Sequence, residues 1–430
     1  MFGTLRLHCF TLASGVLFAA LHLPASAATL CVKPGGAGCY PTIGAAVASA
    51  APGDTIQVSH GVYKEDVIVS KPLSLVGENI ANTIIDAMAL PNGIYVDGID
   101  NPGLSDVTVS GFTVQNANFE GILVTNASRI TIRGNRVTGN DRNLIPSTET
   151  CPGAPAFETA EGFDCGEGIH LSGVEYSTVA DNTVENNAGG ILLSDDTGPT
   201  RHNLIVNNIA RNNPYDCGFV LASHPPAAIT GSTAPLGVTY NTIIGNDSSN
   251  NGLAVEGAGA GVGIFTFLPG GNVSNNTIMN NRLLNNGLPG VAIHAHTPGE
   301  NLDNNQIVGN YISGNGRDTE DAATPGPTGI NIFGVSPIAG TVISQNVIKD
   351  EALDIAVNTP GTVAIHQNDL DGGATGIGNL GSGNVDGTNN WWGCSQGPGS
   401  PGCSGISGSV LAAPWLSTPA TPNGAPNSQH

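Results

Sequence analysis

The sequence predicts an all-β parallel β-helix, a solenoid in which short strands stack coil upon coil. A phrase of Gly, an apolar residue, any residue and an apolar residue recurs, each time near an Asn-rich turn. Gly168 and Gly190 lie about 22 residues apart, a period at which units bury their apolar side only by stacking on neighbours. Two-residue alternation inside each phrase indicates strands rather than helices. The phrases are GILV from Gly121, GIHL from Gly168, GILL from Gly190, GFVL from Gly218, GIFT from Gly263, GVAI from Gly290 and GINI from Gly329.

The composition fits one large domain of this kind. The chain has 430 residues with 60 Gly, and only 11% of its residues are charged. Regular Ile, Val and Leu at alternate positions supply a core, which argues against disorder. The net charge of −21 argues against nucleic acid as a partner, because binding phosphates needs clustered Lys and Arg. We expect a monomer.

Residues 1–27 have the pattern of a secretory signal peptide. Arg6 gives a weak positive start, the stretch from Phe10 to Leu23 is apolar but short, and Ala25-Ser26-Ala27 forms an A-x-A cleavage site. No second apolar stretch of spanning length follows. The mature protein is therefore expected to be secreted or periplasmic, with no membrane span after signal cleavage.

The cysteines fit export to an oxidising compartment. Cys9 leaves with the signal, and three of the remaining spacings suggest local disulfides. These pairs are Cys31 with Cys39, Cys151 with Cys165, and Cys394 with Cys403. Cys217 is left over and precedes a core strand, so we expect a buried thiol. None of the spacings is typical of a zinc site.

The solenoid domain is expected over residues 28–416. Pro41–Ala51 predicts an Ala-rich helix that caps the open N-terminal end, since the first coil otherwise exposes its core. Strands are expected to start at Thr55, Val67, Leu73 and Thr83, and coils to continue to about Asp369.

Three insertions interrupt the coils, at 141–166, 195–202 and 225–236, and such insertions in solenoids often lie on the binding side. Trp391 and Trp392 are expected to cover the C-terminal end, and residues 417–430 to form a disordered tail. Some Asn residues are expected to stack and to hydrogen-bond from coil to coil. They are Asn182, Asn208, Asn246, Asn276 and Asn305.

The segment AAVASAAPGDTIQVSHGVYKEDVIVSKPLSLVGEN from Ala45 resembles the opening of the pectin-lyase-like superfamily. The Asn-rich coils and NNWWG at Asn389 resemble the subgroup that includes the periplasmic accessory protein of nitrous oxide reductase. The resemblance covers nearly all of the mature chain. It implies a single-stranded, right-handed parallel β-helix, in a superfamily of polysaccharide lyases, hydrolases, esterases and epimerases alongside adhesins and accessory proteins. Asp195-Asp196 resembles the paired aspartates of polygalacturonases, but the other motifs of that family are absent.

Ionisable residues gather on one outer face when the coils are aligned on their Gly. Paired carboxylates can divide into acid and base roles, and His beside carboxylates can move protons or bind metal. The predicted catalytic residues are Asp195, Asp196, His170, His224, Glu167 and Asp216. The predicted substrate-binding residues are Phe265, Phe267, His294, His296 and His202.

Three functions fit this face. The first is an exported enzyme on polysaccharide or a cell-envelope glycan, of lyase, hydrolase or epimerase type. It predicts that Asp195, Asp196, His170 and His224 line one groove. The second is a non-catalytic surface or carbohydrate-binding protein. The third is a periplasmic metal-handling accessory protein, for which His294-x-His296 with His224 is the best feature. The sequence is compatible with a Ca²⁺ ion bound at the acidic turn, but no pattern in it identifies a cofactor.

Overall fold

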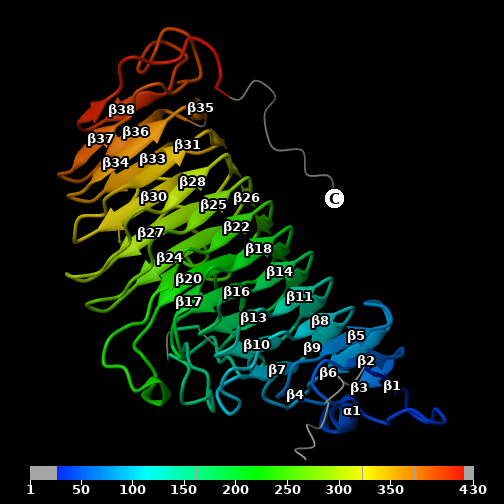
Figure 1. Cartoon of the computed structure of the whole chain (residues 1–430). Helices are drawn as coiled ribbons and strands as arrows, with labels where there is room; N and C mark the ends of the chain where they lie inside the picture. Colours follow the sequence, from blue (N-terminus) through cyan, green and yellow to red (C-terminus); the bar gives the residue numbers. More distant parts are fainter. Residues whose placement is uncertain (1–26, 160–161, 164, 322, 372, 421–430) are drawn as a thin grey trace, which may run out of the picture.

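Each coil of the chain contributes short strands to three parallel sheets in a fixed order. The structure, a computed structural model, describes residues 27–159, 162–163, 165–321, 323–371 and 373–420. In these residues the chain passes from the first sheet to the second and then to the third, and repeats this path one coil further along (Figure 1). Within each sheet, neighbouring strands come from successive coils and pair in parallel. The fold is the predicted all-β solenoid, and residues 1–26 of the predicted signal peptide lie outside the described residues.

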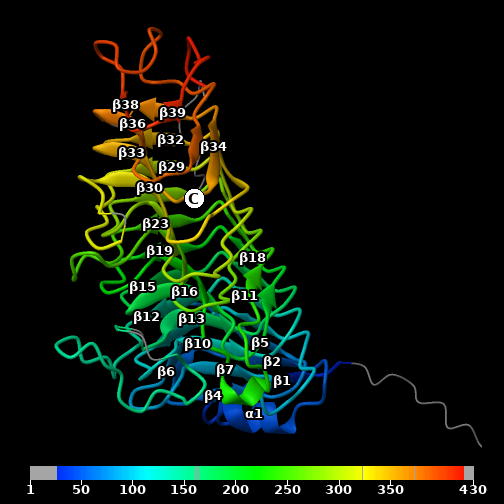
Figure 2. The ribbon, with the colours of Figure 1, turned by 90° about the vertical axis from the view of Figure 1, so that its left-hand side faces the viewer.

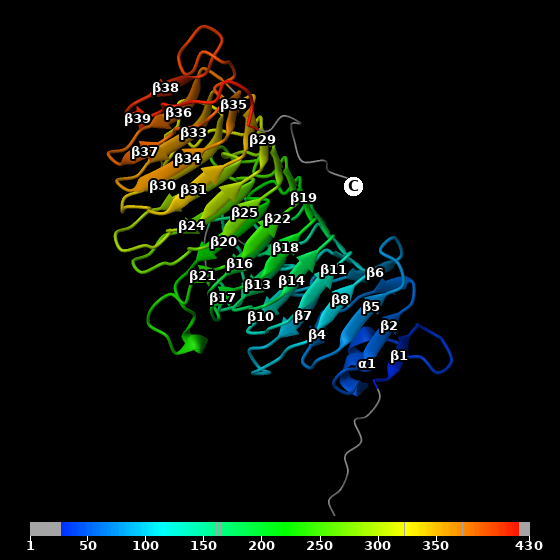
Figure 3. The ribbon, with the colours of Figure 1, turned by 45° about the horizontal axis from the view of Figure 1, so that its top comes forward.

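The strands of the first sheet follow one another along the stack, as Figure 3 shows: β1 (Thr29–Val32), β2 (Thr55–Val58), β5 (Ser74–Gly77), β8 (Thr108–Ser110), β11 (Thr131–Arg133), β14 (Thr178–Ala180), β18 (Leu204–Val206), β22 (Thr242–Ile244), β25 (Thr277–Met279), β28 (Gln306–Val308), β31 (Thr341–Ser344), β34 (Thr362–His366), β37 (Asn384–Asp386) and β39 (Val410–Leu411). The second sheet consists of β3 (Gly61–Tyr63), β6 (Thr83–Asp86), β9 (Thr113–Gln115), β12 (Arg136–Thr138), β15 (Thr183–Glu185), β19 (Ile209–Arg211), β23 (Asp247–Ser249), β26 (Arg282–Leu284), β29 (Tyr311–Ser313), β32 (Val347–Lys349) and β35 (Asp369–Asp371).

The third sheet carries the candidate site. Its strands are β4 (Val67–Val69), β7 (Ile94–Asp97), β10 (Ile122–Thr125), β13 (Glu167–Ser172), β16 (Gly189–Ser194), β20 (Phe219–Ser223), β24 (Val262–Thr266), β27 (Val291–Ala295), β30 (Thr328–Gly334), β33 (Leu353–Asn358), β36 (Thr375–Asn379) and β38 (Gly405–Ser407). Near the C-terminal end these strands lie one above the other in Figure 2. A further pair, β17 (Thr200–Arg201) and β21 (Val238–Thr239), lies in two of the predicted insertions or directly after them.

Apolar side chains at alternate positions form one continuous core inside the coils. In a single coil, Ile132 of β11, Val137 of β12 and Ile169 of β13 all point inward and are fully buried. The register repeats them, since Ile132 pairs with Val179 and Ile169 with Ile191 in the next coil. The alternation in the sequence therefore predicted the inward face correctly.

Both ends of the core are covered. Helix α1 (Ile43–Ser49) begins at Thr42, whose hydroxyl accepts a hydrogen bond of 3.2 Å from the Ala45 amide. Ile43 and Ala46 of this helix belong to the core, beside β1, β2 and β4 (Figure 1). At the other end Trp392 is the largest fully buried side chain, whereas Trp391 is half-buried. The predicted helical cap and the predicted Trp392 cap are both confirmed.

Buried Asn side chains form ladders at the turns between sheets. Asn246, for example, accepts hydrogen bonds from the backbone and side-chain amides of Asn208 (2.8 and 3.1 Å). It donates in turn to Asn281. The predicted hydrogen bonds from coil to coil are confirmed for all five Asn residues, which lie in two different ladders. Asn182, Asn208 and Asn246 belong to a ladder between the first and second sheets, whereas Asn276 and Asn305 belong to a ladder that precedes the first sheet. A third ladder lies between the second and third sheets.

The disulfides and loops follow the predicted plan. Cys31–Cys39, Cys151–Cys165 and Cys394–Cys403 are bonded, and Cys217 is free and buried. The segment between β20 and β21 projects from the solenoid and contains the 3-10 helix η1 (Ala228–Thr230), green in Figures 1 and 3. Within the part of the chain that the structure describes, no helix is long and apolar enough to cross a membrane. Of the predicted tail, residues 421–430 lie outside the described residues.

Candidate functional site

The outer face of the third sheet is not regular from coil to coil. Pairing aligns Val220 with Gly263 and then Ala292, so it is Gly261, and not Gly263, that continues the Gly column through Gly218 and Gly290. The sequence alignment was therefore two residues out of register at this coil. The correction places Phe265 beside Ala222 and His294 on adjacent strands.

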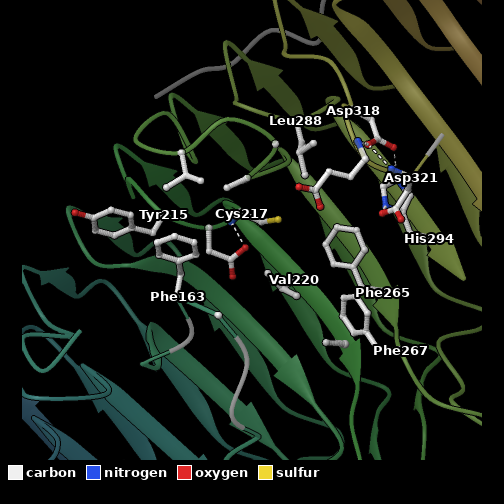
Figure 4. Close-up of a pocket in the computed structure, with 18 of the residues that line it drawn as sticks. Phe163, Tyr215, Cys217, Val220, Phe265, Phe267, Leu288, His294, Asp318 and Asp321 are labelled. Atoms are coloured by element: carbon white, nitrogen blue, oxygen red, sulfur yellow. Dashed lines mark hydrogen bonds and ion pairs between the residues drawn. The ribbon is translucent and has the colours of Figure 1, made fainter. Parts of the chain in front are cut away.

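A cavity of about 420 Å³ lies on this outer face, over β16, β20, β24 and β27 (Figure 4). Its floor is made of outward side chains of the strands. Its walls come from three long connections between the second and third sheets: the predicted insertion 141–166, the segment between β23 and β24, and the segment between β29 and β30. Seven of the predicted site residues line it, namely Glu167, Asp216, His224, Phe265, Phe267, His294 and His296.

Two carboxyl groups meet at one part of the cavity wall. Asp216 shares a hydrogen bond with the Glu167 side chain, and its carboxylate also accepts 2.6 Å from the Cys217 amide. Burial raises the pKa of Asp216 above its usual range, because the charged form loses its water. Gly189 makes this approach feasible, since a Cβ there would lie 2.9 Å from Glu167 Cγ and 3.2 Å from Asp216 Cβ. Asp216 is thus a carboxyl group suited to carry a proton.

His224 lines the cavity and is held by a buried aspartate. Its Nδ1 lies 3.0 and 3.1 Å from the two carboxylate oxygens of Asp196. Burial opposes the charged form of Asp196, but the charge and hydrogen bond of His224 outweigh it and hold the Asp196 pKa below its usual range. Asp196 also accepts from the Thr159 hydroxyl. An imidazole oriented in this way by a carboxylate is a common arrangement for proton transfer.

The hydrogen bonds of Asp195 stabilise the fold rather than point to the cavity. It accepts hydrogen bonds from the Ser223 hydroxyl (3.0 Å) and from the backbone amides of His224 (2.7 Å), Leu236 (2.9 Å) and Gly237 (2.6 Å). Burial raises its pKa. These donors tie the end of β16 to the projecting segment. They also occupy the carboxylate oxygens that a Ca²⁺ ion at this acidic turn would need.

Aromatic and apolar side chains make up much of the cavity surface. Phe265 packs on a small cluster that includes Leu192, Val220 and Leu288, separate from the main core. Phe267 is 49% exposed, and its ring stacks on His296 with centroids 4.3 Å apart. Flat aromatic faces of this kind suit sugar rings. The inserted loops cover much of this outer face.

A second ring pair, Phe163 on Tyr215, lies across the cavity with centroids 5.7 Å apart (Figure 4). Neither residue was predicted. Phe163 belongs to the insertion 141–166, and no pattern in the sequence shows which coil this insertion packs against.

Histidines and aspartates converge on the opposite wall. His294 Nδ1 and His296 Nε2 each lie 3.0 Å from Asp321 Oδ2. Burial opposes the charge of Asp321, but hydrogen bonds from both histidines hold its pKa below the usual range. Burial also opposes the charge of His296, whereas its bonds to Asp321 and to the Thr266 carbonyl raise its pKa. Asp318 and Asp321 were missed because the loop that carries them has no alternation to place it.

The remaining predicted residues lie away from the cavity surface. His170 is buried, with Nδ1 2.8 Å from Glu120 and Nε2 2.8 Å from the Ser194 hydroxyl. Of the four residues expected to line one groove, only His224 does so. Asp195, Asp196 and His170 lie beneath or beside it. His202 stacks between Tyr176 and Tyr240 at the turn before the first sheet, so the structure does not bring it to the site.

The cavity is acidic. Carboxylate side chains from the floor and the loops line it, and none of the described residues that line it is Lys or Arg. Arg317, on the connection between β29 and β30, is paired with Glu256 at 2.8 Å. The acidic lining residues are Glu149, Glu167, Asp216, Glu256, Asp318, Glu320 and Asp321.

Comparisons with known proteins agree with this architecture. Residues 76–264 match the family model described as the right handed beta helix region. The chain is a right-handed parallel β-helix. A search of curated proteins found no match to its sequence.

Several solved structures share the fold at low sequence identity. The A-module of mannuronan C-5 epimerase AlgE4 from Azotobacter vinelandii is 16% identical with a TM-score of 0.51, over 78% of this chain and 92% of that one. The Dettilon tailspike protein (gp208) is 15% identical with a TM-score of 0.52, over 84% and 62%. The catalytic domain of a GH87 α-1,3-glucanase in complex with nigerose is 15% identical with a TM-score of 0.50, over 93% and 69%. At such identities these likenesses establish the fold alone.

Proposed function

We propose that the mature chain is an exported enzyme that cleaves a neutral polysaccharide in the cavity on the third sheet. The observation that carries the proposal is the cavity itself, in which a proton-holding carboxyl group, an oriented imidazole and exposed aromatic rings share one surface. Two of the similar structures, the epimerase and the glucanase, are named for activities on polysaccharides. Export is supported by the three disulfides and by the signal-like start of the sequence.

The charges favour a neutral glycan over an acidic one. Epimerases and lyases of uronate polymers must neutralise a substrate carboxylate, which calls for Arg, Lys or a metal ion near it. The described lining residues include seven carboxylates and no Lys or Arg, so with no cation bound in the cavity a polyanion would be repelled. Hydrolysis of a neutral sugar chain needs only a proton donor, a base and a water molecule.

The side chains divide into two roles on this proposal. Asp216, with its raised pKa, donates a proton to the leaving oxygen, and Glu167 holds that proton in place between turnovers. His224 acts in its neutral form: with Nδ1 donating to Asp196, Nε2 takes a proton from the attacking water. Phe267 offers a ring face for a sugar ring.

The test is a cleavage assay on matched neutral and acidic polysaccharides. The mature protein is incubated with β-glucan, α-glucan, xylan and mannan, and separately with alginate and polygalacturonate. New reducing ends and the ultraviolet absorbance of unsaturated uronates are followed. We expect reducing ends from a neutral polymer only, a rate that falls as pH rises because Asp216 must be protonated, and a loss of roughly 100-fold or more in Asp216→Asn.

A control variant and two contrary outcomes complete the test. Asp181→Asn is the control, since Asp181 is exposed on a turn with a φ of 56° that Asn adopts equally well. Retention on a glycan in affinity gels without any product would support the alternative, a carbohydrate-binding protein. Unsaturated product from alginate or polygalacturonate would refute the preference for a neutral substrate.

The finer resemblance, to the subgroup with the nitrous oxide reductase accessory protein, also remains a proposal. It is supported by the Asn-rich coils and by NNWWG at Asn389. It assigns no reaction to the cavity described above.

A further inference from the structure

We propose that His294, His296 and Asp321 form a binding site for one divalent transition-metal ion at the cavity wall. His294 lies in β27 and His296 directly after it, two positions apart, and both side chains reach the cavity on the outer face. Asp321 reaches them from the connection between β29 and β30 (Figure 4). The inference does not rest on the proposed function, because metal binding can be measured without any glycan.

The ligand atoms already converge. His294 Nδ1 and His296 Nε2 lie at the same distance, 3.0 Å, from one oxygen, Asp321 Oδ2. The ligand atoms of all three residues lie within 4.8 Å of one another. Two ligands each about 2.1 Å from a metal ion, at a right angle to each other, are about 3.0 Å apart. The spacing therefore suits each histidine as a ligand adjacent to Asp321 around one ion.

The other nitrogen of His296 faces an acceptor, as in most metal-ligating histidines, whereas that of His294 faces the side-chain amide of Asn331 beside a carboxylate. His296 Nδ1 lies 2.8 Å from the Thr266 carbonyl, which can only accept, so Nδ1 carries the proton and Nε2 can bind a cation. His294 Nε2 lies 3.5 Å from Asp318 Oδ2 and 3.1 Å from the Asn331 amide, which itself donates 2.7 Å to Asp318. As the structure stands, Asn331 donates toward Nε2; when Nδ1 binds the ion and Nε2 carries the proton, Asp318 is the neighbouring acceptor for it.

The charges also suit an ion of this kind. With no metal bound, both ring nitrogens that face Asp321 must donate protons to one carboxylate oxygen. A divalent ion would replace those two protons and leave two neutral imidazoles. Two imidazoles with one carboxylate favour zinc, iron, cobalt or nickel, whereas Ca²⁺ and Mg²⁺ prefer oxygen ligands throughout.

The surroundings leave room for a further ligand on one side only. Phe265 and Phe333 pack edge-on around the His294 ring, and Phe267 stacks on His296. The side that remains faces the cavity, since His294, His296 and Asp321 all line it. Three protein ligands with an open position are typical of catalytic rather than structural metal sites.

The experiment is equilibrium dialysis of the mature protein against Zn²⁺ and Co²⁺ after chelator treatment. We expect one ion per chain, and a visible Co²⁺ spectrum with histidine ligation. His294→Gln and Asp321→Asn should each weaken Zn²⁺ binding by roughly 100-fold or more, and Asp318→Asn by roughly 10- to 100-fold. His202→Gln, which removes a histidine outside the cavity, is the matched control and should bind like the wild type.

Thermal unfolding shows whether the variants are folded and reports binding a second time. Zn²⁺ should raise the melting temperature of the wild type and of His202→Gln, but not that of His294→Gln or Asp321→Asn. Absence of stoichiometric binding would overturn the proposal, and so would binding that survives both ligand substitutions. Binding lost only in His170→Gln would assign the ion to the buried Glu120, Glu158 and His170 group instead. None of these outcomes depends on whether a glycan is cleaved.

Discussion

The Asn ladders and the outer face of the third sheet use polar side chains in opposite ways. In the ladders, one residue type repeats at one position of successive coils, and each amide is satisfied by its neighbours. On the outer face, equivalent positions on adjacent strands change identity from coil to coil. One such column reads His170, Leu192, Val220, Gly263, Ala292 and Asn331.

This difference separates stability from function within one repeating fold. A solenoid gains stability from interfaces between identical neighbours, so a repeated polar residue is a structural element. The cavity lies where the repeat is broken, both in the strand positions and by long connections that wall it. Substitutions in the two regions should therefore have different readouts, and three of them test that expectation.

The largest loss of stability is expected from breaking a ladder at its centre. In Asn246→Ala the Asn208 amides lose their acceptor and the Ile205 carbonyl loses a donor, all in a buried turn. Each buried polar group left without a partner costs about 1–3 kcal/mol, so we expect the free energy of unfolding to fall by roughly 2–4 kcal/mol. Urea unfolding followed by circular dichroism measures this loss.

Asn384→Ala is the matched control, because Asn384 is exposed at the start of β37. Its effect should stay within about 0.5 kcal/mol. Equal losses in the two variants would show that the ladder contributes no more than any surface Asn, and the contrast drawn above would fail. Zn²⁺ binding at the cavity should persist in folded Asn246→Ala.

The second prediction concerns Glu351, which takes the place of Asn at the end of the third ladder. Its Oε1 accepts 2.9 Å from the backbone amide and 3.1 Å from the side-chain amide of Asn315. Burial raises its pKa from 4.5 to about 7, because the charged form loses its water, and the charge of Asp350 adds to the effect. A raised carboxyl pKa stabilises the fold fully below about pH 4.5, and this stabilisation is lost as pH rises through about 7.

Glu351→Gln keeps the Oε1 acceptor and removes the charge. The wild type should therefore lose roughly 1–3 kcal/mol between pH 5 and pH 8 that the variant retains. Urea midpoints at several pH values measure how the free energy of unfolding of each protein depends on pH. Asp181→Asn removes an exposed carboxylate that does not act on Glu351, and it should keep the wild-type pH dependence. If the free energy of unfolding depends on pH in the same way for the wild type and Glu351→Gln, Glu351 ionises freely in the fold.

The sequence predicted the repeating part of this molecule far better than the part that breaks the repeat. The core face, the helical cap, the local disulfides and buried Trp392 follow from period and spacing. The cavity depends on where long connections fold back, and no local pattern encodes this for Phe163 or Asp321. The error of register at Gly263 has the same cause, since a second Gly two residues earlier offers an equally good start to the phrase.

The smallest effect on stability is expected at Phe267, which tests whether a residue of the cavity serves binding without stabilising the fold. Its ring is half exposed and contacts mainly the His296 ring, so Phe267→Ala should lower the free energy of unfolding by less than about 1 kcal/mol. If the cavity binds a neutral glycan, loss of this ring face should weaken retention in affinity gels by roughly 3- to 10-fold. Trp415→Ala removes another half-exposed ring, away from the cavity, and should leave retention unchanged. A Phe267→Ala protein that unfolds easily but binds glycan normally would reverse the assignment of the two regions, because this ring would then belong to the stabilising part of the solenoid.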